Sequence, residues 1–514
     1  MITQTQGILP FRYEAEVATS GMTGLGGLPA YLEMGVVCGL AESIQRHVRV
    51  CAGRAQGWSD VQVVMPLVLL NVAGGDCVDD LRLLEKDEGF ARLLRRVEWR
   101  RLKRRERREM ERRWRKERKR TVPSPSVVFR YLSAFHDPAE EKKRVVGRAF
   151  IPAANDHLKG LGLVNGDLLA FSQQKAPQPT ATLDQDGTLV ETWKADALYS
   201  YKGDKSYQPV TTYWAEPDMV VNSEFRDGNV PAGWENLRLL REALEVLPQG
   251  VMNVYYRGDT ASYQHELLRY CAEGKNERFG VIEFAVGVDV TPEFKKAVKG
   301  VEKSDWQPLE RADGKRTNQQ WAEVCFVPSW VGHRKGGPEY RFLAIREPLE
   351  QRQLPGLEDH QLPFPTLEMG QVCYKVFGVV TNRTLAGDEV IRWYRGRCGK
   401  SEEVHAAMKN DLAGGQLPSG QFGANAAWWG ITVLAYNLNS LMKRLAMPEG
   451  WAPKRLKAIR FGFIGVAGRV VNHARQLIIR MSASHPAYGL LLGVRRRLRE
   501  LSTEQRLATA QGPP

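Results

Sequence analysis

Apolar residues recur at helical spacing in the first third of the chain and alternate as in strands further along. Helical spacing runs through residues 29–44, and again from the good helix cap Ser59 to residue 73. Gly74-Gly75 ends this second stretch, and helical spacing resumes over 76–84. Two helices joined by a glycine turn are typical of DNA major-groove readers but also of any small helical bundle, so DNA reading by this pair stays open.

The pattern changes after a breaker rich in proline and serine at residues 121–126, which is followed by a short helix through Phe129 and Leu132. Strands are predicted at 167–171, 181–184, 197–201, 207–213 and 219–226, followed by a helix at 235–245, a strand at 251–256 and a helix at 262–271. Strands followed by strand–helix alternation indicate an α/β (α+β) fold with an RNase H-like catalytic core.

A long insertion interrupts this core. Residues 260–401 are too many for one connection between a strand and a helix, and strands predicted at 280–286, 322–327 and 340–345 make the insertion mostly β. A strand at 374–381 returns to the core, and an apolar helix at 425–445 should pack behind it. Residues 469–481 and 495–499 are predicted to be helical and basic.

Charge is concentrated in one segment. The 514 residues carry a formal net charge of +14, and residues 100–120 hold 14 Lys or Arg against four Glu. Like charges at this density repel along a helix, so a phosphate backbone is the predicted partner, with a solvated or disordered segment as the alternative. The candidate DNA contacts in this segment are Arg104, Arg105, Arg108, Arg112 and Arg115.

Pattern and charge together predict five parts. They are a helical, basic DNA-binding domain (1–150), the first part of an RNase H-like core (151–285), a β-rich insertion (286–370), the second part of the core (371–450) and a basic helical C-terminal segment (451–514).

Cysteine spacing and hydropathy argue against several classes of protein. The seven cysteines form no Cys-x-x-Cys pair, which argues against a zinc module and a disulfide framework and favours a reducing cytoplasm. The apolar run at 61–73 is too short to span a bilayer, and no secretory signal pattern opens the sequence. We therefore expect a cytoplasmic protein with no membrane partner.

Acidic residues follow two predicted strands and open one predicted helix. Asp184 and Asp186 lie at the end of the extended run that begins at Thr180, and Asp259 follows the strand at 251–256. Glu402 begins a helix that carries His405 and Lys409 on the same face. Taken singly, each could be a turn former, a helix cap or part of a solvated face. Three carboxylates without a Cys or His cage favour phosphoryl transfer with two Mg²⁺ ions, because hard cations prefer oxygen ligands. Arg257, Arg397 and Lys409 would suit contacts to a polyanionic substrate.

These motifs resemble bacterial insertion-sequence transposases of the DDE class, most closely the thirteen-eighty insertion-sequence family within the wider group that carries a Tyr-Arg-Glu-Lys signature. The motifs, in order, are Leu183-Asp-Gln-Asp-Gly-Thr188, Tyr256-Arg-Gly-Asp-Thr260, Tyr394-x-x-Arg397, Glu402-x6-Lys409, Asn425-Ala-Ala-Trp-Trp and Leu434-Ala-Tyr-Asn-Leu438. The resemblance runs from the first core strand to the C-terminus and includes the basic N-terminal part.

The resemblance implies specific roles. Asp186, Asp259 and Glu402 would form the catalytic triad and hold two Mg²⁺ ions, with Mn²⁺ as a substitute, while Tyr394, Arg397 and Lys409 would form the signature. The step from Arg397 to Glu402 is one residue longer than usual, which leaves Glu403 as a rival third acid. Glu402 is preferred because it keeps the spacing to Lys409, and Asp186 is preferred to its rival Asp184 because Asp186-Gly-Thr188 fits the family's Asp-x-Thr pattern.

The resulting hypothesis is a DNA transposase that binds the terminal inverted repeats of its insertion sequence, cuts a phosphodiester and joins the 3′-hydroxyl to target DNA. Its partners would be double-stranded DNA and a second copy in a dimeric synaptic complex, in a bacterial cytoplasm at the nucleoid. The alternatives are an RNase H-like nuclease without strand transfer and an inactive DNA-binding repressor. Whether the second DNA strand is cut through a hairpin intermediate stays an open question. One of Trp306, Trp321 and Trp330 could stack on an unpaired base, but a core position is favoured for each.

Overall fold

The computed structural model forms two compact units. It describes residues 20–53, 57–98, 103–105, 108, 120–145, 147–311, 313–328, 340–349, 362–474 and 476–510. Unit 1 consists of residues 1–45, 49–131 and 442–514, and unit 2 of residues 46–48 and 132–441. Segments from both ends of the chain therefore build one unit.

Unit 1 contains helices from both ends of the chain. They are α1 (Leu28–Val37), α2 (Leu40–His47), α3 (Asp60–Ala73), η1 (Val78–Asp80), α4 (Leu81–Lys86), α5 (Glu88–Glu98), α7 (Pro125–Leu132), η8 (Glu449–Trp451), α16 (Leu456–Ile459), the π-helix η9 (Arg460–Ile464) and α17 (Pro486–Ala510). Ser59 and Gln62 form a capping box at the start of α3, and Gly74 ends it in the left-handed conformation, as predicted. The helix predicted at 29–44 is broken at Gly39 (φ +72°) into α1 and α2.

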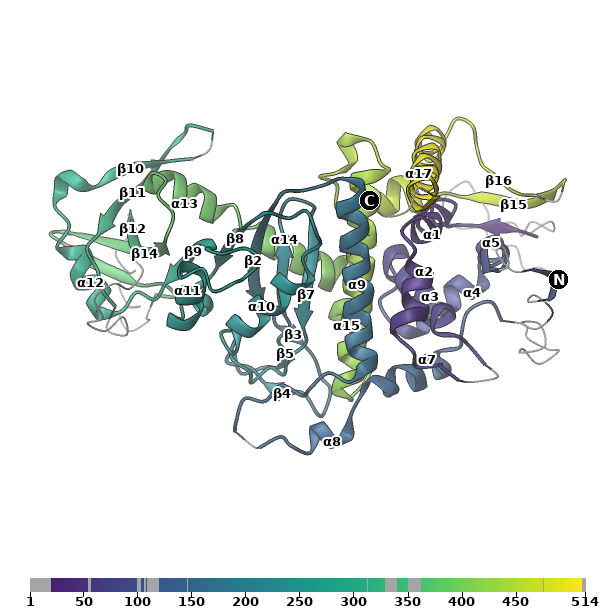
Figure 1. Ribbon diagram of the computed structural model, residues 1–514, viewed down its shortest axis with the longest axis horizontal. Coiled ribbons are helices and arrows are strands. Elements are labelled where there is room, and N and C mark those ends of the chain that lie inside the picture. Colours follow the sequence, from purple (N-terminus) through teal and green to yellow (C-terminus); the bar gives the residue numbers. More distant parts are fainter. Residues whose placement is uncertain are drawn as a thin grey trace, which may run out of the picture. The chain divides into compact units, whose positions relative to one another are not determined.

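A small antiparallel sheet completes unit 1. Its order is β1-β15-β16, with β1 (Met22–Thr23) paired to β15 (Gly468–His473) and β15 paired to β16 (Gln476–Arg480). Figure 1 shows β15 and β16 as a ribbon at the end of the colour scale. The helix predicted at 469–481 is wrong, because Val470-Val471 and Ile478-Ile479 favour extended backbone.

Unit 2 is organised by a large mixed sheet. Within the described residues this sheet has ten strands in the order β10-β11-β12-β14-β9-β8-β2-β6-β7, with β13 also paired to β14. The strands are β2 (Thr180–Gly187), β6 (Val210–Trp214), β7 (Met219–Glu224), β8 (Asn253–Gly258), β9 (Glu283–Val288), β10 (Gln307–Glu310), β11 (Arg316–Val324), β12 (Arg341–Pro348), β13 (Thr366–Met369) and β14 (Val372–Thr381).

Five strands at one end of this sheet confirm the predicted fold class. In the order β7-β6-β2-β8-β9, β6 is antiparallel to both β7 and β2, whereas β2, β8 and β9 run parallel. This is the strand arrangement of an RNase H-like core. The helices α10 (Asn236–Val246) and α11 (His265–Ala272) connect its later strands.

The strands of the predicted insertion continue the same sheet. β12 pairs with β14 in antiparallel register, and β11 and β10 follow outward from β12. A helix, α12 (Pro292–Lys299), lies between β9 and β10 along the chain. Three short strands, β3 (Val190–Glu191), β4 (Leu198–Tyr199) and β5 (Lys205–Tyr207), form a separate small sheet between β2 and β6 in the sequence.

Helix α9 (Asp156–Lys175) occupies the place where a strand was predicted at 167–171, so that prediction is wrong. Asn155 caps the helix by accepting a hydrogen bond from the Leu158 amide (3.0 Å). Leu161, Val164 and Leu168 are buried at helical spacing. The apolar run 168–171 has only four residues and fits either element, and only the longer window reveals the helix.

Helix α9 lies beside α15 (Phe422–Leu445), and both contact β7 (Figure 1). The Asn437 side chain on α15 accepts a hydrogen bond from the Val220 amide (2.8 Å) and donates to the Asn165 side chain on α9 (2.6 Å). Asn165 in turn donates to the carbonyls of Val220 and Val221. α15 confirms the helix predicted at 425–445.

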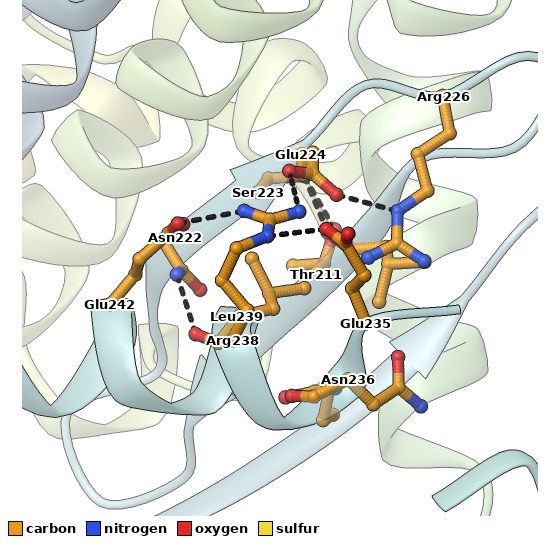
Figure 2. A network of polar contacts seen from close by, with 12 residues as sticks. Thr211, Asn222, Ser223, Glu224, Arg226, Glu235, Asn236, Arg238, Leu239 and Glu242 are labelled. Atoms are coloured by element: carbon orange, nitrogen blue, oxygen red, sulfur yellow. Dashed lines mark hydrogen bonds and ion pairs between the residues drawn. The ribbon is translucent and has the colours of Figure 1, made fainter. Parts of the chain in front are cut away.

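Helix α10 is tied to β7 by a charged network. Figure 2 shows Arg238 between Glu224 on β7 and two acids of its own helix region, Glu235 and Glu242. The fully buried Arg226 donates to the same Glu224 (2.7 Å). This edge of the core is therefore held by shared carboxylates.

Among the described residues, no single helix is long and apolar enough to cross a membrane. One bent helix pair, Asp60–Ala73 with Val78–Lys86, has sufficient length and apolar composition only when its two parts are taken together.

Candidate active site

Asp186 and Asp259 lie at the carboxyl ends of two neighbouring parallel strands, Asp186 within β2 and Asp259 directly after β8. The parallel register of β2 and β8 places Asp184 opposite Arg257 and Gln185 opposite Gly258, so Asp186 and Asp259 are the next residues on the two neighbouring strands. Asp259 caps the short 3-10 helix η3 (Thr260–Ser262) by accepting a hydrogen bond from the Ala261 amide (3.0 Å).

Glu402 lies on α14 (Lys400–Ala406), which follows α13 (Gly387–Arg395). Gly399 occupies the cap position with φ +78°, a conformation that favours glycine, and no side chain caps the helix. Ser401 is buried in the first turn. The Glu402 side chain is exposed.

The negative charges of Asp259 and Glu402 act on the carboxyl group of Asp186. Burial raises the pKa of Asp186 to about 6, Arg397 opposes this shift, and the negative charges of Asp259 and Glu402 add to it. A cation placed among these carboxylates would therefore be stabilised.

Arg397 and Tyr394 lie next to these acids. The Arg397 Nη2 is 3.6 Å from Asp186 Oδ2, and the guanidinium lies 5.9 Å from the centre of the Tyr394 ring. Burial disfavours the charge of Arg397, but Asp186, Tyr394 and Asp259 outweigh burial and raise its pKa. Burial also raises the pKa of Tyr394 to about 12.

Gly287 on β9 allows this close approach. A Cβ atom at this position would lie 2.9 Å from the Tyr394 hydroxyl and 3.2 Å from the Thr260 amide nitrogen. Glycine therefore lets the signature tyrosine and the residue after Asp259 pack against the same strand.

His405 is a site residue that the predicted triad and signature did not include. Its Nδ1 lies 3.9 Å from Asp186 Oδ2, and the side chain is buried. Burial, followed by Lys409 and Arg397, lowers the pKa of His405 to about 4, so the imidazole is neutral at physiological pH. Its position three residues after Glu402 was the available sequence signal.

Lys409 lies beyond a change in helix geometry. The α-helix ends at Ala406 and continues as the π-helix η6 (Ala407–Asp411), which alters the face predicted from i, i+3 and i+7 spacing. Lys409 Nζ donates to the Leu189 carbonyl just after β2 (3.1 Å), and burial lowers its pKa.

The two rival acids have partners elsewhere. Asp184 is buried and accepts two hydrogen bonds from Arg257, at 2.6 and 2.7 Å. Glu403 lies 3.4 Å from Lys400, which lies at the same distance from Asp218.

Arg257 uses its guanidinium inside the protein. Besides Asp184, it donates to the Trp393 carbonyl (2.7 Å) and lies over the Trp393 ring. Because Arg257 is buried, a role in positioning β2 and β8 is favoured over the contact to a polyanionic substrate that the sequence suggested.

The other predicted DNA contacts are distant in sequence from the acids. Arg104, Arg105 and Arg108 are exposed, whereas Arg112 and Arg115 lie outside the described residues. Trp306 and Trp321 are buried, as favoured, and Trp330 lies outside the described residues.

The described side chains include no group of three or more His, Cys, Asp or Glu placed closely enough to hold a metal ion. The chemistry of the donors nevertheless fits a hard divalent cation. Two of the candidate donors, Asp186 and Asp259, lie at the carboxyl ends of neighbouring parallel strands, and the charges of Asp259 and Glu402 act on Asp186.

The family described as Transposase DDE domain group 1 matches residues 14–335 and 366–503. The chain belongs to this family. The matched segments contain Asp186, Asp259 and Glu402. No curated protein matches. Among solved structures, the chain is similar to the piggyBac transposase in a synaptic complex with hairpin DNA, with 10% sequence identity, a TM-score of 0.43, and coverage of 84% of this chain and 78% of that chain.

Proposed function

We propose that this protein is a DNA transposase that binds the terminal inverted repeats of an insertion sequence, cuts a phosphodiester there and transfers the 3′-hydroxyl to target DNA. One observation carries the proposal: in a DDE transposase family member, Asp186 and Asp259 end neighbouring parallel strands and Glu402 acts electrostatically on Asp186. The narrower thirteen-eighty insertion-sequence family is part of the same proposal.

The surroundings of the rival acids support the choice of triad. Asp184 is neutralised by a bidentate arginine and is fully buried, so it is not available to a substrate. Glu402 is among the charges that act on Asp186, whereas Glu403 pairs with Lys400. Asp186, Asp259 and Glu402 are therefore the preferred catalytic acids.

Asp186, Asp259 and Glu402 would hold two divalent cations, Mg²⁺ or Mn²⁺. When bound, such a pair supplies Lewis acidity and an activated water or hydroxyl for in-line displacement at phosphorus. Asp186 loses the proton that burial favours when it binds a cation, so occupancy falls as the pH drops below its pKa.

The neighbouring polar groups position the substrate. Arg397 Nε is buried without a hydrogen bond among the described residues, and its Nη2 points to Asp186, so the guanidinium can donate to a phosphate oxygen beside the acids. Tyr394 with its hydroxyl protonated and neutral His405 would keep Arg397 and Asp186 in place without adding charge. Lys409 fixes the segment that follows Asp186.

The basic segment at 100–120 would bind the DNA backbone without base specificity. Pairing two element ends requires a dimer in the synaptic complex. A protein that cuts and joins chromosomal DNA would act in the bacterial cytoplasm at the nucleoid.

The test is cleavage of an end-labelled duplex that carries the element's terminal repeat, with Mg²⁺ and a target plasmid. We expect cutting at the repeat end and a joined product for the natural chain, and neither for Asp259→Ala, although that variant still binds DNA. Cutting without a joined product would replace the transposase with a nuclease. Tight binding without cutting by either chain would contradict enzyme function and leave a DNA-binding repressor.

A further inference from the structure

The C-terminal part of the chain carries a second concentration of positive charge. Residues 451–499 contain eleven Lys or Arg and no Asp or Glu. They are Lys454, Arg455, Lys457, Arg460, Arg469, Arg475, Arg480, Arg495, Arg496, Arg497 and Arg499. A run of this sign with no internal acid indicates a polyanionic partner.

Several of these arginines are used within unit 1. Arg460 donates to the carbonyls of Asn71 and Val72, at 2.6 and 2.8 Å. Arg495 donates to Glu33 (3.0 Å), and Arg497 donates to Glu500 (3.3 Å). These side chains have structural partners, so they are not the best candidates for a docking surface.

The ribbon of β15 and β16 presents its arginines differently. Cross-strand neighbours share a face of the sheet, and the register pairs Arg469 with Arg480, Val471 with Ile478 and His473 with Gln476. Four of these six side chains are exposed and the other two are half-buried. We call this set the outer face of the ribbon.

The opposite face is the one that packs against the protein. Val470 is fully buried there, and helix α5 packs beside β15. The burial of the reverse side therefore leaves the outer face as the exposed one among the described residues.

Arg469 and Arg480 lie directly opposite each other, an arrangement that destabilises a sheet unless an anion is present. Arg469 Nε makes one long hydrogen bond to the Ser20 carbonyl (3.4 Å), and Arg480 has no ion pair or side-chain hydrogen bond among the described residues. Their outward groups can each bind a phosphate.

We propose that the outer face of the β15–β16 ribbon binds duplex DNA through its phosphate backbone. A two-stranded ribbon fits the major groove, which is about 12 Å wide, and a six-residue strand extends roughly 20 Å along it. The face is a poor contact for a second copy of this chain, because each copy would bring the same two arginines. The proposal rests on the proposed function only in that DNA is the substrate.

The test is equilibrium binding of the full chain to a fluorescein-labelled duplex without divalent cations, over a series of salt concentrations. The variant is Arg469→Gln/Arg480→Gln. Loss of two phosphate contacts should reduce the slope of log K against log salt by about 2 and weaken binding on the order of tenfold at moderate salt. The charge-matched control Arg495→Gln/Arg497→Gln should keep a steeper slope than the ribbon variant.

The single variant Arg480→Gln protects the test against a folding defect, because this side chain has no ion pair or side-chain hydrogen bond to lose within the described part of the chain. It should reduce the slope by about 1. An unchanged slope in both ribbon variants, with binding retained, would overturn the ribbon inference and leave the proposed cleavage function untouched. A change in sedimentation without a change in DNA binding would also overturn it, by making the ribbon an interface between copies. Absence of DNA binding by the natural chain would instead contradict the proposed function.

Discussion

Asp184 and Asp186 are two residues apart on one strand and face different surroundings. Asp184 meets Arg257 in a bidentate pair, whereas Asp186 has Arg397 3.6 Å away and two negative neighbours. The charge of the first carboxylate is therefore balanced inside the protein by Arg257, and the second is held in an unfavourable charge environment that a cation would relieve.

Loss of Arg257 should destabilise the protein strongly. Arg257→Ala leaves the buried charge of Asp184 without its partner, which costs about 3–5 kcal/mol. Urea unfolding followed by circular dichroism measures the change. The control Arg316→Ala removes an exposed arginine 3.6 Å from Glu310 and should cost less than about 1 kcal/mol. A loss below that level for Arg257→Ala would contradict the assigned role.

Asp227 should make stability depend on pH. Burial raises its pKa to about 7, Arg144 (2.7 Å) opposes the shift and Glu141 adds to it. Because the unfolded carboxyl has a pKa of about 3.9, the folded protein binds the extra proton between these values, and stability falls as pH rises through this window.

The contribution of Asp227 should reach about 1.4 kcal/mol per pH unit. Unfolding free energies measured from pH 5 to 7 should therefore fall less steeply for Asp227→Asn than for the natural chain. The exposed control Asp313→Asn should follow the natural profile. Parallel profiles for all three chains would refute the prediction.

Residue types in sequence predicted the acids but not their partners. Asp186-Gly-Thr188 and Glu402-x6-Lys409 are visible as motifs. The pairing of Asp184 with Arg257 depends on the parallel register of β2 and β8, which no local pattern encodes. His405 lies 3.9 Å from Asp186, more than 200 residues away in sequence, so its place in the site was visible only as helical spacing to Glu402.

At the level of elements, long periodic segments were predictable and short apolar runs were not. The capped helix α3 and the apolar helix α15 were predicted with accurate positions. The strand predicted at 167–171 failed because four consecutive apolar residues, 168–171, fit α9 equally well. The prediction of a helix at 469–481 was wrong because the β-branched pairs Val470-Val471 and Ile478-Ile479 favour the two antiparallel strands.

The hydrogen bonds by which Asn165 on α9 and Asn437 on α15 bind β7 and each other should stabilise the protein cooperatively. Asn437→Leu leaves the Val220 amide without its acceptor and should cost about 1–3 kcal/mol. Asn165→Leu should cost a similar amount, and the double variant less than the sum, with a coupling of at least about 0.5 kcal/mol. Urea unfolding of the four chains gives the cycle. Strict additivity would show that the two side chains act independently.

At the scale of the whole molecule, the sequence predicted the class of fold but not how distant segments combine. The insertion was expected to be mostly β, and its strands continue the core sheet through the β12–β14 pair. Unit 1 joins residues near both ends of the chain, because β1 pairs with β15 and α17 packs on α1. Such non-local pairing leaves no mark in hydrophobic spacing.

Removal of α17 should therefore loosen the N-terminal helix α1. Leu498 and Leu501 are fully buried on α17, and deleting residues 486–514 would expose the surface that they cover. Hydrogen exchange should show lost protection in α1 and retained protection in α9, which belongs to unit 2. Unchanged protection of α1 would contradict this account of unit 1.

The most direct test of the central claim replaces each proposed acid by cysteine and compares cleavage of the terminal-repeat duplex in Mg²⁺ and in Mn²⁺. A thiolate is a poor ligand for hard Mg²⁺ and a better one for Mn²⁺. Asp186→Cys, Asp259→Cys and Glu402→Cys should be inactive in Mg²⁺ and partly active in Mn²⁺, whereas Glu403→Cys should cut in both. A metal switch in Glu403→Cys, or Mg²⁺-dependent cutting by Glu402→Cys, would contradict the proposed triad.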